Sequence, residues 1–274
     1  MDLKILSWNV EHFTGNKTGD RKDRVRNVVD LIKAEAPDIF ALMEVEGSTI
    51  FREFTDSFPG WSFSVTEGPQ VQEILIGWRS GLSAFMTQRN EFKSGNKSLR
   101  PAALLTISPS AGETLSLLFS HLKSFPSPEG YGLRDGMIEK VRKLKRAIDR
   151  GTDKQGKFIV LGDLNTMGLN LTFSKNDLTG PEETARIDKI LGGKDMHRQP
   201  KTHGATFNNG SKSSYDPADL DHVYASSNCD FVPLADGSHI RIAGWAEEPD
   251  QASTDAWIAK FSDHAPLIFT LQNL

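Results

Sequence analysis

Several apolar runs of this sequence end in side chains that could cleave a phosphate ester. In the clearest case residues 159–161 are apolar, Gly162 follows, and Asp163 and Asn165 stand just beyond it. Residues i and i+2 of an extended segment point the same way, so Asp163 and Asn165 are expected to reach one pocket. An aspartate can hold a metal ion or a water, and an asparagine can donate to an oxyanion. The same tetrapeptide is also an ordinary strand exit in which both side chains bond nearby backbone.

Polar groups recur at other predicted strand ends. They are Asn9, Glu44, His121, Asp221, Asp263 and His264. Carboxylate oxygens suit Mg²⁺ or Mn²⁺, and the single cysteine, Cys229, excludes a multi-cysteine metal site. Phosphodiester cleavage needs an activated water, neutralised phosphoryl oxygens and help for the leaving oxygen. A carboxylate, a metal ion, and imidazole and amide donors would together supply all three.

The first elements of the chain predict how two of these groups meet. Residues 3–9 predict a strand that ends at Asn9, and the apolar spacing of residues 25–32 predicts a helix. A second apolar strand at 38–43 leads to Glu44. A strand–helix–strand unit of this length favours parallel strands, whose carboxyl ends lie side by side. We therefore expect Asn9 beside Glu44.

The rest of the chain predicts a mixture of strands and helices in a single domain over residues 1–274. Short strands, as in an antiparallel meander, are predicted at 61–66, 73–79, 82–87, 101–108 and 114–121. An amphipathic helix over 132–150 has a basic outer face, for which solvation is favoured over phosphate contact. Strands follow at 157–165 and 220–225 and after Asp263-His264, with a short helix over 182–191 in a long polar stretch.

The composition is that of a soluble globular protein, with 38% hydrophobic and 25% charged residues. No apolar run reaches the roughly 18 residues that cross a membrane, and the N-terminus leaves no room for a signal peptide. We expect a cytoplasmic monomer without stable membrane association. The net charge of −4 argues against coating of duplex nucleic acid. Residues 216–274 hold ten acids and two basic residues, a charge of −8, which leaves +4 for residues 1–215, where a phosphate-rich substrate is expected.

Six short segments, in this order, resemble the endonuclease/exonuclease/phosphatase superfamily, which includes deoxyribonucleases, abasic-site endonucleases, sphingomyelinases and inositol-polyphosphate phosphatases. The segments are Ser-Trp-Asn9, Ala-Leu-Met-Glu44-Val, Ser-His121-Leu-Lys-Ser, Leu-Gly-Asp163-Leu-Asn165, Leu-Asp221-His-Val-Tyr-Ala-Ser and Ser-Asp263-His264-Ala-Pro-Leu. The resemblance spans residues 5–269. It implies an α/β (α+β) fold, a deoxyribonuclease-like four-layer α/β/β/α sandwich with two mixed β-sheets.

The resemblance also implies a role for each matching residue. Glu44 would bind Mg²⁺ or Mn²⁺ with Asn9 beside it, and Asp263 would approach the metal or a second cation. Asp163 would orient and deprotonate the attacking water, while Asn165 contacts the phosphate. His264 would touch the phosphate, and Asp221 would hold the imidazole of His264 in place.

Other residues bear on the substrate. His121 matches the histidine of the deoxyribonuclease and sphingomyelinase branches, where abasic-site enzymes have tyrosine. Arg100 resembles the arginine that the family brings towards a substrate phosphate, and Lys123 could act likewise, although a plain surface role is equally open for both. Glu73 could orient His121, with a surface role favoured. Asp219 rivals Asp221, and only the family register prefers the latter.

The sequence therefore predicts a Mg²⁺- or Mn²⁺-dependent phosphodiesterase, a nuclease that hydrolyses DNA or RNA by in-line attack of water. One alternative is a phosphodiesterase or phosphatase that acts on a phospholipid or small phosphate ester. The Trp-Cys-Asp-Arg signature of the inositol phosphatases is missing, and no long aromatic hairpin for membrane insertion is evident. A second alternative is a binding module with an inactive site, against which the retained polar set argues.

Overall fold

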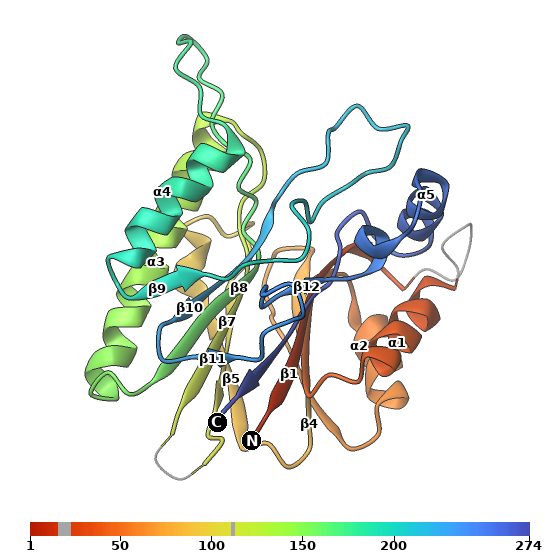
Figure 1. Ribbon diagram of the computed structural model, residues 1–274, viewed down its shortest axis with the longest axis vertical. Helices are drawn as coiled ribbons and strands as arrows, with labels where there is room; N and C mark the ends of the chain where they lie inside the picture. Colours follow the sequence, from red (N-terminus) through yellow and green to blue (C-terminus); the bar gives the residue numbers. More distant parts are fainter. Residues whose placement is uncertain (16–22, 111–112) are drawn as a thin grey trace.

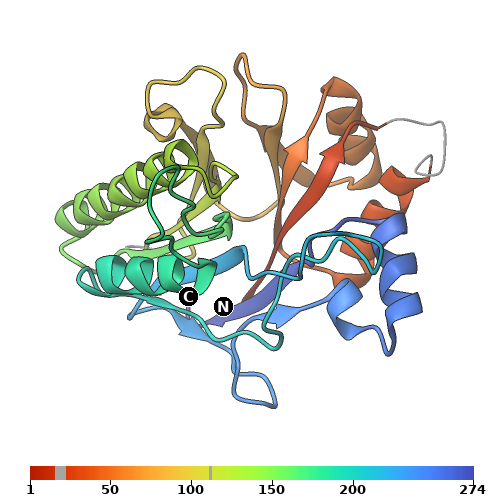
Figure 2. The same ribbon diagram turned by 90° about the horizontal axis from the view of Figure 1, so that it is seen from above.

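Two mixed β-sheets pack face to face, and helices cover the outer face of each sheet (Figures 1 and 2). The computed structural model describes residues 1–15, 23–110 and 113–274. This arrangement is the four-layer α/β/β/α sandwich that the sequence predicted. Each sheet is built around one parallel pair of strands joined by a helix, β1-α1-β2 in the first and β7-α3-β8 in the second.

The first sheet has the strand order β11-β13-β1-β2-β4-β3, with β12 paired to β13. Its strands are β1 (Leu3–Phe13), β2 (Ile39–Val45), β3 (Trp61–Val65), β4 (Glu73–Arg79), β11 (Asp230–Phe231), β12 (Arg241–Ile242) and β13 (Leu267–Gln272). The helices on its side of the molecule are α1 (Arg24–Glu35), α2 (Ser48–Ser57) and α5 (Gln251–Lys260), and the 3₁₀ turn η2 (Gly244–Glu247) precedes α5.

The second sheet has the order β5-β6-β7-β8-β10-β9. Its strands are β5 (Ala84–Arg89), β6 (Ala102–Ile107), β7 (Leu115–His121), β8 (Lys157–Asp163), β9 (Met196–Arg198) and β10 (Asp221–Ser226). Its outer face carries the helices α3 (Pro128–Gly151) and α4 (Gly180–Gly192), and the 3₁₀ turn η1 (Asn90–Lys93) lies between β5 and β6.

The predicted meander over residues 61–122 is divided between the two sheets. Strands β3 and β4 pair with each other and with β2 in the first sheet, whereas β5, β6 and β7 form an antiparallel run in the second. The chain crosses from one sheet to the other at the turn around Gly81. Local alternation predicts strands but not the sheet to which each strand belongs, so the single meander was wrong.

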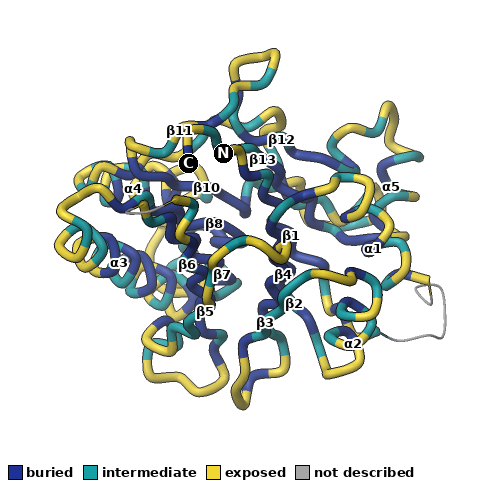
Figure 3. The backbone as a smooth tube through the Cα atoms, turned by 90° about the horizontal axis from the view of Figure 1, so that it is seen from below, coloured by how far each residue is buried: buried dark blue, intermediate teal, exposed yellow. Residues whose placement is uncertain are grey.

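The central strands of each sheet are buried on both faces because each sheet lies between a helical layer and the other sheet, whereas the edge strands β3 and β5 are partly exposed (Figure 3). In β8, Ile159 and Leu161 enter the core between the sheets, while Phe158 and Val160 pack under α3 and α4. Continuous apolar runs are typical of strands covered on both sides. No helix among the described residues is long and apolar enough to cross a bilayer.

Gly162 allows the two sheets to approach at the end of β8. A Cβ atom there would lie 2.4 Å from the carbonyl oxygen of Ser120 and 2.6 Å from Cε of Met43 in the opposite sheet. Its φ of 120° is also one that side chains rarely adopt. The absence of a side chain at Gly162 thus permits this close approach, which brings Asp163 to the junction of the sheets.

Candidate active site at the junction of the two sheets

The carboxyl ends of both parallel strand pairs meet at one rim, at the top of Figure 1. In the register of the first sheet Asn9 pairs with Met43, so that Glu44 follows directly beside it. In the second sheet Asp163 lies between His121 on β7 and Asp221 on β10. The register of each sheet therefore gathers its own groups at the rim, and the docking of the two sheets brings the two sets together.

Asp163 joins the two halves of this site. Its Oδ2 accepts a hydrogen bond from Nδ2 of Asn9 at 3.0 Å, and the same amide lies 3.2 Å from Oε1 of Glu44. Nε2 of His121 is 3.4 Å from Asp163 Oδ2 and 3.6 Å from Glu44 Oε1. The expected meeting of Asn9 and Glu44 is confirmed, with the amide bridging the two carboxylates.

A buried dyad of His264 and Asp221 lies next to Asp163. Nδ1 of His264 is 2.7 Å from Oδ2 of Asp221, and its Nε2 is 3.9 Å from Asp163 Oδ2. The backbone on both sides of this imidazole is fixed, because Trp8 donates to the His264 carbonyl and the Thr206 hydroxyl accepts the Asp221 N–H. His264 thus directs its Nε2 towards Asp163, and Asp221 holds the ring through Nδ1.

Burial and neighbouring charges shift the pKa values of this group. Burial raises the pKa of Asp163 to about 7, although His264 opposes the shift. Burial also opposes the charge on His264, but Asp221 and Asp163 outweigh it and raise its pKa to about 10. Burial, followed by the charges of Arg100 and His264, lowers the pKa of His121 well below its usual 6.5. At neutral pH one imidazole is therefore cationic and the other neutral.

Asn165 turns away from the extended geometry expected of it. Strand β8 ends at Asp163, and Asn165 has a φ of 51°, which asparagine tolerates better than most residues. Its backbone N–H donates to Asp163 Oδ1 at 2.9 Å, and its Nδ2 donates to the Leu122 carbonyl at 3.1 Å. Both side chains do bond nearby backbone, and these bonds hold Asn165 at the rim rather than removing it.

Glu44 lies at an irregularity near the end of β2, where the pairing register with β4 shifts, and its φ of 64° is strained. Its Oε2 accepts hydrogen bonds from Gln72 Nε2 at 2.8 Å and from the backbone N–H of His12 at 2.9 Å. Strained residues persist where the surroundings hold them, and they concentrate at functional sites. Gln72 also accepts a hydrogen bond from the guanidinium of Arg100, which therefore reaches the same rim.

The other predicted residues lie at different distances from this centre. Asp263 carries a carboxyl whose pKa burial raises to about 6, with Glu11 and Glu44 adding to the shift. Lys123 projects its ammonium over the ring of Phe125, 5.1 Å from the centroid. Glu73 does not orient His121, because its carboxylate accepts hydrogen bonds from Thr66 and Gln70 instead. Glu73 opens β4 opposite Val45, close to Glu44 along the sheet, but its carboxylate is held by these two partners.

The choice between Asp219 and Asp221 is decided by their partners. Asp219 forms a salt bridge with the buried ammonium of Lys201, which also donates to the Asp221 carbonyl at 2.8 Å. Only Asp221 contacts His264. Sequence analysis missed Lys201 and Gln72, and no spacing signal marks either residue, since each acts through a contact between distant segments.

The buried carboxylate and imidazole groups of this site fit a metal ion. Asp163, Asp221 and His264 each place one ligand atom within 4.8 Å of the others, and all three are buried. Asp221 Oδ1 and His121 Nδ1 are buried atoms for which the described residues supply no hydrogen-bond partner. Buried carboxylates with free lone pairs are suitable cation ligands. The predicted ligands Glu44 and Asn9 adjoin this cluster through Asp163.

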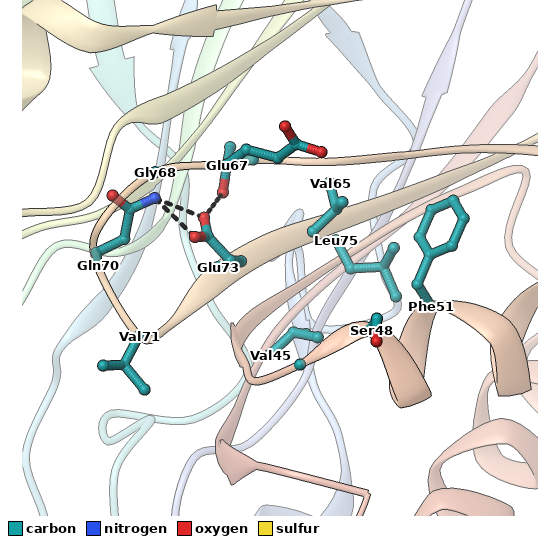
Figure 4. Close-up of a pocket in the computed structure, with 12 residues that line it drawn as sticks. Val45, Ser48, Phe51, Val65, Glu67, Gly68, Gln70, Val71, Glu73 and Leu75 are labelled. Atoms are coloured by element: carbon teal, nitrogen blue, oxygen red, sulfur yellow. Dashed lines mark hydrogen bonds between the residues drawn. The ribbon is translucent and has the colours of Figure 1, made fainter.

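A cavity of about 470 Å³ opens beside Val45, between α2 and the β3–β4 hairpin. Figure 4 shows Val45, Phe51, Val65 and Leu75 along its wall, with the Glu73 carboxylate at its polar end. Burial raises the pKa of Glu73.

The strand ends bring together carboxylates, amides and imidazoles, which are the groups that hydrolysis of a phosphate ester needs. The fold and the site together are those of a phosphate-ester hydrolase. In a comparison with known protein families, residues 6–264 match the endonuclease/exonuclease/phosphatase family, so the chain belongs to that family. A search of curated proteins finds no match to the chain.

Solved structures share the fold at low sequence identity. Truncated Caenorhabditis elegans TDP2 has a TM-score of 0.69 at 16% identity, over 98% of this chain and 97% of that one. A Bacteroides vulgatus endonuclease/exonuclease/phosphatase has a TM-score of 0.67 at 14% identity, over 99% of both chains. A Bacteroides thetaiotaomicron mannosyl-6-phosphatase has a TM-score of 0.63 at 15% identity, over 98% and 99%. A Danio rerio TDP2 structure, complexed with single-strand DNA product, is also similar, with a TM-score of 0.63 at 16% identity over 99% of both chains.

Proposed function

We propose that this protein is a Mg²⁺- or Mn²⁺-dependent phosphodiesterase that hydrolyses nucleic acid. The observation that carries the proposal is the position of Asp163, which contacts Asn9 of the other sheet and lies 3.9 Å from the imidazole of His264. A water held between that carboxylate and a substrate phosphorus could attack in line. A bound divalent cation would neutralise phosphoryl oxygens and ease deprotonation of the attacking water.

Asp163 is the proposed base. Its pKa, raised by burial to about 7, suits proton transfer near neutral pH. Asn9 donates to its Oδ2 and the Asn165 backbone donates to its Oδ1, so the carboxylate is held in one orientation. The amide of Asn165 retains one N–H beyond its bond to Leu122, and it would donate this N–H to a phosphoryl oxygen.

His264 is the proposed cation at the phosphoryl group. Because its pKa lies near 10, the ring carries a positive charge at neutral pH and donates a charge-assisted hydrogen bond. Asp221 fixes the ring through Nδ1, which leaves Nε2 to face the substrate. His121 is neutral and would donate or accept at the leaving side, while Arg100 would attract the negative substrate to the rim.

The residues that would hold the cation are Glu44, with Asn9 and Asp263 nearby, and the adjoining carboxylates of Asp163 and Asp221. The single-strand DNA in the similar Danio rerio structure supports nucleic acid as the substrate class. The similar mannosyl-6-phosphatase favours a small phosphate ester as the second candidate.

A substrate panel tests the proposal. The purified protein is incubated with labelled DNA, RNA, bis(p-nitrophenyl) phosphate, sphingomyelin and sugar phosphates under Mg²⁺ or Mn²⁺, with and without EDTA. We expect cleavage of nucleic acid that EDTA abolishes, and a loss of at least about a hundredfold in rate for Asp163→Asn. Asp56→Asn, an exposed change on α2, is the control. Undiminished cleavage by Asp163→Asn would exclude the assigned base, and turnover of sugar phosphates alone would favour the second candidate.

A further inference from the structure

We infer that Phe125 and Lys123 form a subsite for a nucleotide next to the scissile phosphate, and that the substrate is therefore single-stranded nucleic acid. The inference rests on the proposed function, since the subsite is defined relative to that catalytic centre. It goes further because it names the strandedness of the substrate and the residues that recognise it.

The backbone of Phe125 is strained without any gain from burial. Its φ is 78°, a left-handed conformation in which a bulky side chain is an outlier, yet its side chain is 61% exposed. Such strain costs on the order of 1–3 kcal/mol and persists only where the surroundings hold it. An exposed aromatic ring in this conformation contributes little to the core, which points to a role at the surface.

A buried arginine holds the segment that carries the ring. Arg134 on α3 donates to the carbonyls of Phe125 at 2.8 Å and Lys123 at 3.0 Å, and it pairs with Glu183 on α4 at 2.7 Å. The backbone N–H of Phe125 donates to Sδ of Met167 at 3.1 Å. These contacts fix the segment in one conformation before any substrate arrives, which lowers the entropic cost of binding.

The ring lies close to the catalytic centre along the chain. Leu122 donates to the Asp163 carbonyl at 2.9 Å and accepts from the Asn165 amide at 3.1 Å. Phe125 is three residues further, so its Cα lies within about 11 Å of the Cα of Leu122. A nucleotide adjoining the one at the rim can therefore reach Phe125.

The chemistry around the ring suits a base and its phosphate. The Lys123 ammonium lies on one face of the ring, 5.1 Å from the centroid, and can meet a phosphate there. A hollow of about 440 Å³ adjoins the ring. Its lining includes one cation, Lys123, and one carboxylate, Glu129, with Phe125, Pro126, Ser127, Pro128, Asn170 and Thr172 between them. Aromatic stacking beside a cation is how sequence-tolerant binding of single strands is achieved.

Strandedness follows from the geometry of stacking. A base can lie on an aromatic side chain only when it has left the stack of a duplex. The net charge of −4 also leaves no general attraction for the polyanion, so local contacts must supply the affinity. A preformed ring with a single cation favours an unpaired strand over a duplex.

The test compares substitutions of two equally exposed phenylalanines. Binding of a fluorescein-labelled oligothymidine and of a duplex of equal length is measured by anisotropy in EDTA, at one fixed salt concentration. Phe125→Leu should weaken single-strand binding at least about fivefold, and Phe125→Trp should retain it. Phe85→Leu on the edge strand β5, also 61% exposed, should change nothing. Thermal unfolding of every variant verifies that it is folded.

Hydrolysis of bis(p-nitrophenyl) phosphate separates this inference from the proposed function, because so small an ester does not extend to Phe125. If the wild type and Phe125→Leu hydrolyse it equally under Mg²⁺ while only Phe125→Leu loses oligothymidine binding, both proposals are supported. Equal oligothymidine binding by wild type and Phe125→Leu, or an equal loss with duplex, overturns the subsite alone. Failure of the wild type to hydrolyse either ester or polymer overturns the proposed function instead.

Discussion

Asp219 and Asp221 have different partners, and substitution of each residue tests its role. Asp221 bonds the imidazole, whereas Asp219 bonds Lys201. Asp221→Asn keeps the shape but removes the charge that orients the ring, so we expect at least about a hundredfold loss of rate. Asp219→Asn should lower stability and leave the rate of the folded enzyme nearly unchanged. Steady-state kinetics on bis(p-nitrophenyl) phosphate, with unfolding curves for both variants, would contradict the assignment if Asp219→Asn lost as much activity.

At the scale of single residues, the sequence predicted the site through groups placed at strand ends. Asn9 and Glu44 are brought together by the register of the first sheet, and His121, Asp163 and Asp221 by that of the second. The docking of the sheets then joins the two sets. The sequence did not predict the left-handed backbone of Asn165, the bond from Gln72 to Glu44 or the partners of Glu73. Each depends on backbone angles or on contacts between segments that a linear pattern does not contain.

At the scale of elements, the sequence predicted the strands and the helices α1, α3 and α4, the last as the short helix over 182–191, but it did not predict α2 or α5. The apolar stripe over 132–150 corresponds to α3, and every strand predicted within residues 61–122 is present. Helix α5 has no clear apolar stripe, because its contacts with the sheet come through Trp257 and Ile258 alone among the large residues. Sheet membership was equally hidden, since the crossing between β4 and β5 leaves no mark in the alternation of residues.

The end of β8 gives a prediction that belongs to this scale. Gly162→Ala places a methyl group 2.4 Å from the Ser120 carbonyl at a φ of 120°, so β7 and β8 must separate. We expect a loss of about 2–5 kcal/mol in the free energy of unfolding. Gly132→Ala on α3, where nothing lies within 4 Å, should instead stabilise by about 0.5–1 kcal/mol. The free energy of unfolding of both variants is measured by urea titration. An unchanged unfolding midpoint for Gly162→Ala would show that β7 and β8 can move apart without loss of stability.

At the scale of the whole molecule, the site spans the interface of the two sheets. Asn9 and Glu44 come from the first sheet, and His121 and Asp163 come from the second. An apolar core lies between the two sheets. The distances within the site therefore depend on how the sheets are docked. Loosening that core should remove activity and the folded structure together, rather than activity first.

A substitution in that core, remote from the rim, tests this coupling. Leu105→Ala on β6 empties a fully buried position and should cost about 2–5 kcal/mol. Activity and intrinsic fluorescence should then disappear at the same lowered urea concentration, while the rate without urea stays close to wild type. Thr106→Ala, the next residue on the opposite face, is the control. Activity that vanished well below the unfolding midpoint would indicate that the rim opens independently of the sheets.

The strand order of the first sheet has a consequence for biosynthesis. Strand β13 follows all other strands along the chain, yet it sits between β11 and β1, and His264 lies just ahead of it. A nascent polypeptide on the ribosome therefore cannot complete this sheet, or present the imidazole to Asp163, until its final strand has emerged. Truncated translation products should accordingly be inert towards phosphodiesters, so a cell would not meet a half-made hydrolase.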